Sequence, residues 1–389
     1  MRACEVAHHH GYEYIWIDSS CINKDSSSEL SEAINSMYNW YSRAEVCYAF
    51  LSDVPHDDDV AAEGSAFRKS RWFSRGWTLQ ELIAPQRVLF LSSQWTTLGT
   101  KAELAGVIQE ITRVDRDVLM HIESLNDKSV AQRMSWAAGR ETTRVEDKAY
   151  SLLGIFGIAM PTLYGEGVQA FRRLQEEILR RFPDQSLFAW GVVGPYSQDM
   201  PTSLRIQRVV FVADPRRSLF GSSADVFKTS NKIVPSYDDT LHEFKLPPLE
   251  FTPTPYGIRT RLHLIPINRT LMSNLIYNVK WGQDGDVDGQ RRWYLAVLGC
   301  GHSDHPDKLL GRVCYTTSSN SGIRLVYPGE AVVHLSSGEE RQGPNMFALS
   351  PSDLDLHDPD SQARILHLPY LEQTASRPRP SLEIGRAHV

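Results

Sequence analysis

The stretch from Ala44 to Phe90 constrains the fold more than any other part of the sequence. It opens with the apolar, β-prone run Ala44–Leu51 and leads into a second such run at Arg87–Leu91, and each run is typical of a buried strand. Between the runs lie an acidic loop and a short helical segment ended by Pro85, because proline cannot continue a helix. This order of strand, helix and strand predicts parallel strands in an α/β layer.

The same stretch gathers side chains that can carry chemistry: Arg71, Trp72, Arg75, Trp77, Thr78, Gln80 and Glu81. On a helix, Trp77 and Glu81 are four residues apart and share one face. This face is expected to hold a carboxylate beside a large aromatic ring at a strand exit, where open α/β sheets bind ligands. The alternative is structural, namely an Arg–Glu pair and two core tryptophans. Both interpretations stay open at this point.

Five ordered blocks of the sequence resemble the fungal heterokaryon-incompatibility (HET) domain. They are Tyr14–Lys24, Arg71–Leu82, Ala131–Ala137, Arg144–Gly154 and Leu163–Gly167. Within them we expect ligand, pocket or motif residues at Asp18, Ser19, Cys21, Arg71, Arg75, Trp77 and Gln80, and structural motif residues at Trp72, Trp136, Arg144 and Asp147. The resemblance implies a role in fungal self/non-self recognition and programmed cell death. It describes a cytoplasmic signalling module that works through protein partners or self-association.

A more remote similarity links Ala44–Leu51 and Trp77–Leu82 to the strand and Trp-Cys-x-x-Glu-Leu helix of TIR domains, with Thr78 in the place of the cysteine. It implies a TIR-like or flavodoxin-like layer and marks Glu81 as the catalytic carboxylate of an NAD-cleaving hydrolase. NAD would be its substrate, and no cofactor is expected. Such a carboxylate stabilises the cationic character that develops on the ribose as nicotinamide leaves. This hydrolase is the alternative to the signalling module.

Composition argues against several classes of partner and site. The formal net charge of -6 disfavours a nucleic-acid or anionic-membrane surface. The five cysteines form no CxxC pair, which predicts reduced thiols and no zinc site. No apolar run approaches the roughly 20 residues of a membrane span. The consecutive His8, His9 and His10 point about 100° apart on a helix and cannot bind one metal ion together.

Local signals predict further elements of the first half. Tyr12–Ile17 alternates aromatic and aliphatic residues and predicts a strand. Four capping boxes are expected to open helices, at Ser26–Glu29, Thr100–Glu103, Ser129–Gln132 and Thr143–Glu146. A last helix is predicted from Glu166 to about Arg181, with Val168 among its buried residues. The preceding Tyr164–Gly167 is interpreted as a turn rather than a phosphate-binding loop.

Three side chains receive structural rather than functional interpretations. Cys21 has no histidine near it in sequence to activate it, so a partly buried thiol is favoured over a nucleophile. Arg140 and Arg144 flank Glu141, which predicts a salt-bridge cluster at a helix start, although arginine forks also suit phosphate.

After residue 185 the helical spacing of apolar residues fades and short alternating runs replace it. We expect a HET domain over residues 1–185 with its first strand missing, a linker over 186–204, a β-rich domain over 205–376 and a disordered tail over 377–389. Residues 383–389 resemble translated sequencing adapter and are treated as partly artefactual. Strands of a mainly antiparallel domain are predicted at Arg205–Val212, Ile258–Leu264, Arg292–Leu298, Val313–Thr316, Ile323–Tyr327 and Ala331–Leu335. Core or interface packing is favoured for Trp281, Trp293 and Tyr294.

Overall fold

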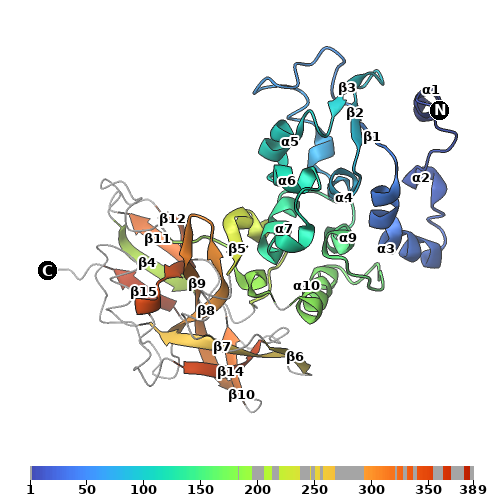
Figure 1. Cartoon of the computed structure of the whole chain (residues 1–389). Coiled ribbons are helices and arrows are strands. Elements are labelled where there is room, and N and C mark those ends of the chain that lie inside the picture. Colours follow the sequence, from blue (N-terminus) through green and yellow to red (C-terminus); the bar gives the residue numbers. More distant parts are fainter. Residues whose placement is uncertain are drawn as a thin grey trace. The chain divides into compact units, whose positions relative to one another are not determined.

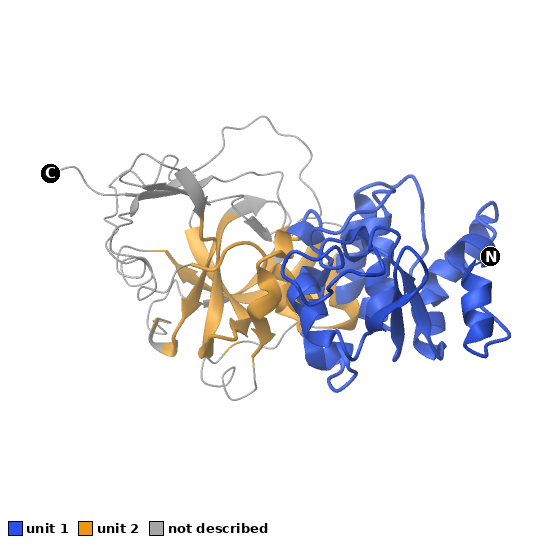
Figure 2. Cartoon of the chain, turned by 90° about the horizontal axis from the view of Figure 1, so that it is seen from above, with its two compact units in different colours: residues 1–128, 133–178, 222–225 blue, residues 129–132, 179–221, 226–389 orange. Residues whose placement is uncertain are grey.

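The structure is a computed structural model of the chain (Figure 1). It describes residues 2–182, 184–194, 206–212, 219–236, 246, 250–254, 257–267, 293–319, 322–326, 331–335, 340–353, 362–368 and 381–385. The chain divides into two compact units (Figure 2). Unit 1 comprises residues 1–128, 133–178 and 222–225, and unit 2 comprises residues 129–132, 179–221 and 226–389.

The first 181 residues are mainly helical around three short strands. The helices and strands are α1 (Arg2–His9), α2 (Asp18–Cys21), α3 (Ser27–Arg43), β1 (Cys47–Phe50), η1 (Arg71–Ser74), α4 (Thr78–Ile83), β2 (Val88–Leu91), β3 (Thr97–Thr100), α5 (Ala105–Thr112), α6 (Arg116–Leu119), η2 (Leu125–Asp127), α7 (Val130–Ala137), α8 (Asp147–Tyr150), α9 (Leu153–Phe156) and α10 (Gln169–Arg181).

The strands of unit 1 form a small mixed sheet in the order β1, β2, β3 (Figure 1). As predicted, β1 and β2 are parallel, with Cys47 opposite Val88. The third strand, β3, was not predicted and runs antiparallel to β2. Phe90 of β2 is buried together with Phe67 and Phe73, in edge-on and tilted contacts with ring centroids 5.1 to 6.1 Å apart. This aromatic cluster anchors the segment between β1 and β2.

The strand predicted at Tyr12–Ile17 does not form. Residues 12–17 lead into α2 without pairing to any described strand. Tyr14 is 89% exposed, whereas the Trp16 ring packs edge-on against Trp40 and Tyr41 of α3, at 5.3 and 5.7 Å. The aromatic alternation therefore reflects packing against a helix rather than a sheet.

Two of the four predicted capping boxes form in full. Thr100 and Glu103 exchange hydrogen bonds before α5, and Ser129 and Gln132 do so before α7. At the third, Ser26 caps α3 by accepting from the Glu29 N–H, but the Glu29 carboxylate accepts from the Asn23 N–H instead of the Ser26 N–H. The box at Thr143–Glu146 is wrong, because Glu146 instead accepts from the backbone N–H groups of Gly165 and Gly167, at 2.8 and 3.0 Å. Those N–H groups lie in the predicted turn, which is confirmed.

Close helix packing explains one glycine, and the last helix starts later than predicted. Gly154 of α9 lies directly against Tyr38 of α3, with no room for a Cβ. The last helix begins at Gln169, three residues later than expected, so Val168 is 65% exposed, whereas Leu174 and Ile178 within the helix are buried.

The later part of the chain is built mainly of strands, joined by short 3-10 turns. Its elements are η3 (Gln185–Phe188), β4 (Ile206–Val212), η4 (Ala224–Phe227), η5 (Ser230–Lys232), β5 (Ile233–Pro235), β6 (Phe251–Thr254), β7 (Gly257–Pro266), β8 (Trp293–His302), β9 (His305–Ser319), β10 (Gly322–Val326), β11 (Ala331–Leu335), β12 (Glu340–Gly343), β13 (Met346–Leu349), η6 (Pro351–Asp353), β14 (Gln362–Leu368) and β15 (Ser381–Gly385).

Five strands of unit 2 form a closed ring. β8 pairs with β9, β9 with β10, β10 with β14, β14 with β7, and β7 with β8. All of these pairings are antiparallel except β10 with β14. A second sheet has the order β12, β11, β4, β15. The six strands predicted in this half are therefore confirmed, and so is the mainly antiparallel character.

The core of unit 2 holds an arginine among apolar side chains. Arg312 is fully buried, its guanidinium lies 4.0 Å from the Trp190 ring centroid, and its Nη1 donates to the Phe188 and Trp190 carbonyls. Trp293 and Tyr294 are buried as predicted, whereas Trp281 lies outside the described residues. Part of the expected disordered tail forms β15, which pairs with β4.

Candidate functional site

Helix α4 positions Glu81 because two side chains in its first half donate hydrogen bonds to backbone carbonyls. The Thr78 hydroxyl donates to the Trp72 and Arg75 carbonyls, at 2.6 and 2.8 Å. The Gln80 amide is buried and donates to the Ser151 carbonyl at 2.7 Å. Gln80 therefore ties α4 to the segment after α8. Glu81 itself is half-buried on this anchored helix.

The carboxyl group of Glu81 lies among side chains from four segments. The Trp72 side chain donates a hydrogen bond to it, Tyr41 of α3 hydrogen-bonds with it, and Asp18 of α2 adds a second negative charge. Burial, together with the Asp18 charge, raises the pKa of Glu81 to about 7. Tyr41, whose pKa is also raised by burial and by Glu81, stays protonated. We call Glu81, Asp18, Tyr41, Trp72, Arg75 and Arg140 the Glu81 cluster.

Two arginines partly offset the charge of Glu81. Arg75 is exposed, whereas Arg140 is 6% exposed and donates to the carbonyls of Trp136 and Arg75 and to the hydroxyl of Thr78. Burial lowers the pKa of Arg140 to about 10, against the opposing effect of Glu81. Among the described residues Glu81 makes no ion pair within 4.0 Å. The Arg–Glu pair of the structural interpretation is therefore absent there.

The ring beside Glu81 is Trp72, whereas the expected neighbour Trp77 faces another carboxylate. Trp77 is half-buried and hydrogen-bonds with Asp147, which also accepts from the Tyr164 hydroxyl at 2.9 Å. Burial raises the pKa of Asp147. The Arg144 guanidinium lies 4.3 Å from the Tyr164 ring centroid. Trp77, Asp147, Arg144 and Tyr164 thus form a second group, which joins α4, α8 and the turn before α10.

The remaining predicted residues lie apart from Glu81 or on the surface. Arg71 has an 82% exposed side chain that reaches Asp53 at 3.6 Å. Ser19 and Cys21 are exposed on α2. The partly buried thiol predicted for Cys21 is wrong, because no strand precedes α2 and nothing covers that helix turn. Trp136, named above as a structural motif residue, is 2% exposed.

The predicted salt-bridge cluster of Arg140, Arg144 and Glu141 does not form. Arg140 turns into the core, Arg144 stacks on Tyr164, and Glu141 contributes its backbone to Gly76 and Ser74, at 2.8 and 2.7 Å. The backbone bonds hold the loop after α7 against η1. The spacing of charges along the sequence therefore predicted the wrong partners for these arginines, which contact backbone carbonyls and an aromatic ring instead of Glu141.

Tyr41 and Cys47 are further neighbours of Glu81, and neither was predicted. Cys47 begins β1, and burial, followed by the Glu81 charge, raises the pKa of its thiol. The carboxylate therefore interacts with the first residue of β1, not with the strand exit that was expected. The spacing of Tyr41 on the apolar stripe of α3 was the only local signal for it.

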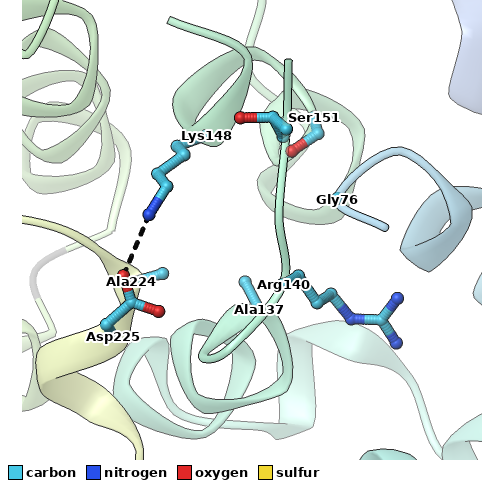
Figure 3. A pocket seen from close by; sticks show the side chains of 8 residues that line it. Gly76, Ala137, Arg140, Lys148, Ser151, Ala224 and Asp225 are labelled. Carbon is cyan, nitrogen blue, oxygen red and sulfur yellow. Dashed lines mark hydrogen bonds and ion pairs between the residues drawn. The ribbon is translucent and has the colours of Figure 1, made fainter. Parts of the chain in front are cut away.

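A small cavity lies near this region, lined by residues that include Gly76, Arg140, Lys148, Ser151 and Asp225 (Figure 3). Its volume is about 10 Å³, which is room for one water molecule. Lys148 points at Asp225 and bonds it at 3.0 Å, while the Arg140 guanidinium points away from that pair (Figure 3). This cavity is too small for an organic ligand.

In the Glu81 cluster, a carboxyl group with a pKa of about 7 is hydrogen-bonded by the Trp72 indole and the Tyr41 phenol. This arrangement is suited to general acid–base chemistry or to a proton-sensitive contact. Within the described part of the chain, no three His, Cys, Asp or Glu side chains could hold a metal ion. No described helix is long and apolar enough to cross a membrane.

Comparisons with known proteins agree with the resemblance drawn from the motifs. Residues 1–65 match the family described as heterokaryon incompatibility protein (HET). Over 184 residues the chain is 45% identical to the vegetative incompatibility protein HET-E-1 of Podospora anserina. That match covers 46% of this chain but only 14% of the relative's length.

Residues 169–372 match a second family, described as a domain of unknown function, DUF8212. No solved structure matches the chain. The comparisons give no support to a TIR-like hydrolase. The chain belongs to the DUF8212 family, whose model matches residues 169–372, and its first 65 residues are similar to the HET family.

Proposed function

We propose that this protein acts in heterokaryon incompatibility, as a module that signals cell death through protein partners or self-association in the cytoplasm. The observation that carries the proposal is the 45% identity over 184 residues to a vegetative incompatibility protein. The geometry supports contact-based signalling, because several motif side chains, Ser19, Cys21, Arg71 and Arg75 among them, are exposed rather than gathered in a cleft.

Exposed motif residues are the place to test this proposal. We would express the chain in a filamentous fungus and compare it with the double variant Arg71→Ala, Arg75→Ala, scoring cell death at matched protein levels. Arg116→Ala, an exposed arginine outside the motif blocks, is the matched control. We expect the wild type and the control to kill and the double variant to fail. Equal killing by all three would overturn contact through this surface, and no killing by the wild type would overturn the proposal itself.

A TIR-like or flavodoxin-like arrangement for unit 1 is a finer proposal. Its support is the parallel pairing of β1 with β2 across a connection that contains η1 and α4, which is the pattern of a βαβ unit. NAD cleavage by Glu81 belongs to the same idea. If the protein acts by contact alone, a stable Glu81→Gln variant should still kill, and cellular NAD should stay unchanged. If the protein is a hydrolase, Glu81→Gln should lose both the killing and the NAD cleavage of the wild type.

A further inference from the structure

A large hollow lies in unit 1 at the start of the two parallel strands. Its volume is about 520 Å³, and its lining includes His10, Tyr12, Tyr48, Arg87, Thr97 and Lys101. The lining residues Val46 and Arg87 directly precede β1 and β2. Sites for small organic ligands have about 300–1,000 Å³, so this hollow has the size of a ligand site, unlike the cavity in Figure 3. We call it the basic hollow.

The lining of the basic hollow contains cations and no carboxylate. Arg87 is exposed and makes no salt bridge to any described residue. Lys101 is 2% exposed, and its ammonium group donates to the uncharged carbonyls of Leu82 and Pro85. The chain as a whole has a net charge of -6. Arg87 is therefore the exposed cation of this lining, whereas the Lys101 ammonium is buried, and a concavity focuses the field of such a charge.

One side of the basic hollow is aromatic. The His10 ring stacks on Tyr48 with centroids 5.6 Å apart, and His10 Nδ1 lies 2.8 Å from the Tyr48 hydroxyl. Burial and the nearby Tyr12 raise the pKa of Tyr48, and Arg87 opposes them, so these three side chains interact. Flat rings with polar edges offer a stacking surface for a planar ligand group.

From this geometry we propose that the basic hollow binds a phosphorylated ligand with a planar ring, of the size of a nucleoside monophosphate. Arg87 is placed to receive the phosphate, because a guanidinium presents paired donors that match phosphate oxygens. Tyr12, Tyr48 and His10 receive the ring, and the Thr97 side chain, with its hydroxyl donor, also lines the hollow. The inference does not depend on the proposed incompatibility role.

Titration of the whole chain with three probes tests this inference. The probes are adenosine monophosphate, adenosine and inorganic phosphate, and binding is followed by calorimetry. We expect saturable binding of the monophosphate with a dissociation constant below about 1 mM, and weaker binding of each fragment. Arg87→Ala should weaken monophosphate binding by about tenfold or more, and Arg87→Lys by less, because lysine keeps the charge but loses the paired donors.

Arg43→Ala is the matched control, since Arg43 is also exposed and lies at the end of α3, outside the basic hollow. It should leave binding unchanged within about twofold. Arg87 is on the surface, so its variants should fold, and circular dichroism spectra that match the wild type would verify this. Three results would overturn the inference: no binding of the monophosphate, binding that survives in Arg87→Ala, or adenosine that binds as tightly as its monophosphate.

Discussion

Glu81 and Glu146 lie in the same unit, yet their pKa values shift in opposite directions. Burial and the nearby Asp18 raise the pKa of Glu81 to about 7. Hydrogen bonds from its own backbone N–H and from those of Gly165 and Gly167 lower the pKa of Glu146. The difference shows that backbone donors stabilise a carboxylate, whereas burial beside another acid penalises its charge. Glu146 holds the fold together, and Glu81 carries a charge that the fold disfavours.

Removing the Trp72 indole, which donates a hydrogen bond to Glu81, should lower the stability of the protein the most. Trp72 is 8% exposed and packs edge-on against Phe73 and Phe90, so Trp72→Ala should lower the free energy of unfolding by about 3–5 kcal/mol. Trp77→Ala should cost less, because Trp77 is only half-buried. Urea unfolding of both variants measures this. Equal losses would mean that Trp72 packing does not support the Glu81 cluster.

Removing Glu146 comes second. Glu146→Ala leaves two backbone N–H groups without their acceptor, which should cost about 2–4 kcal/mol in total. The pKa of Glu146 is lowered from 4.5, so its contribution exists above pH 4.5 and fades as the pH falls below it. Thermal unfolding at neutral and acidic pH measures this. The exposed Glu141→Ala is the control, and an equal loss there would remove the special role of Glu146.

Neutralising Glu81 should raise the stability of the protein, whereas the two preceding substitutions lower it. The pKa of Glu81 is raised from 4.5 to about 7, so the folded state binds the proton more tightly, and wild-type stability should fall as the pH rises between these values. Glu81→Gln should therefore gain stability relative to the wild type at pH 8, by up to about 3 kcal/mol, and little at pH 4.

Asp18→Asn refines this last comparison. It removes the second negative charge near Glu81 and should lower the pKa of Glu81 by a fraction of a unit, because Asp18 is exposed and its charge is screened. Titration of the Glu81 side chain by NMR measures that shift. The contrast with Glu146 would be contradicted if the stability difference between Glu81→Gln and the wild type stayed the same from pH 4 to pH 8.

Local signals predicted those elements that the chain can specify by itself. β1, β2 and the box at Ser129 depend on apolar runs or on residues three positions apart, and they formed. β3 was missed because Thr97–Thr100 has little apolar pattern, and it is a strand only through its pairing with β2. The segment at residues 12–17 has the pattern of a strand but no strand to pair with.

The sites show the same division between local and distant information. Glu81 and Trp72 were both singled out because they lie in one motif block, although the predicted neighbour of Glu81 was Trp77. Lys101 and Arg140 were not recognised as buried cations, because their partners are backbone carbonyls of remote segments. Backbone groups leave no trace in residue identity, so a sequence pattern cannot reveal which of them will receive a charge.

The closed ring of unit 2 dictates when that unit can be completed during synthesis. Closing the ring requires β7 to pair with β14, and this register joins Ile258 to Leu368. Contacts so far apart in sequence form late, because a long loop must first be ordered. Until β14 has left the ribosome, the edges of β7 and β10 that it will cover remain open to other strands. These edges therefore stay open to mispairing while the residues between β7 and β14 are being synthesised.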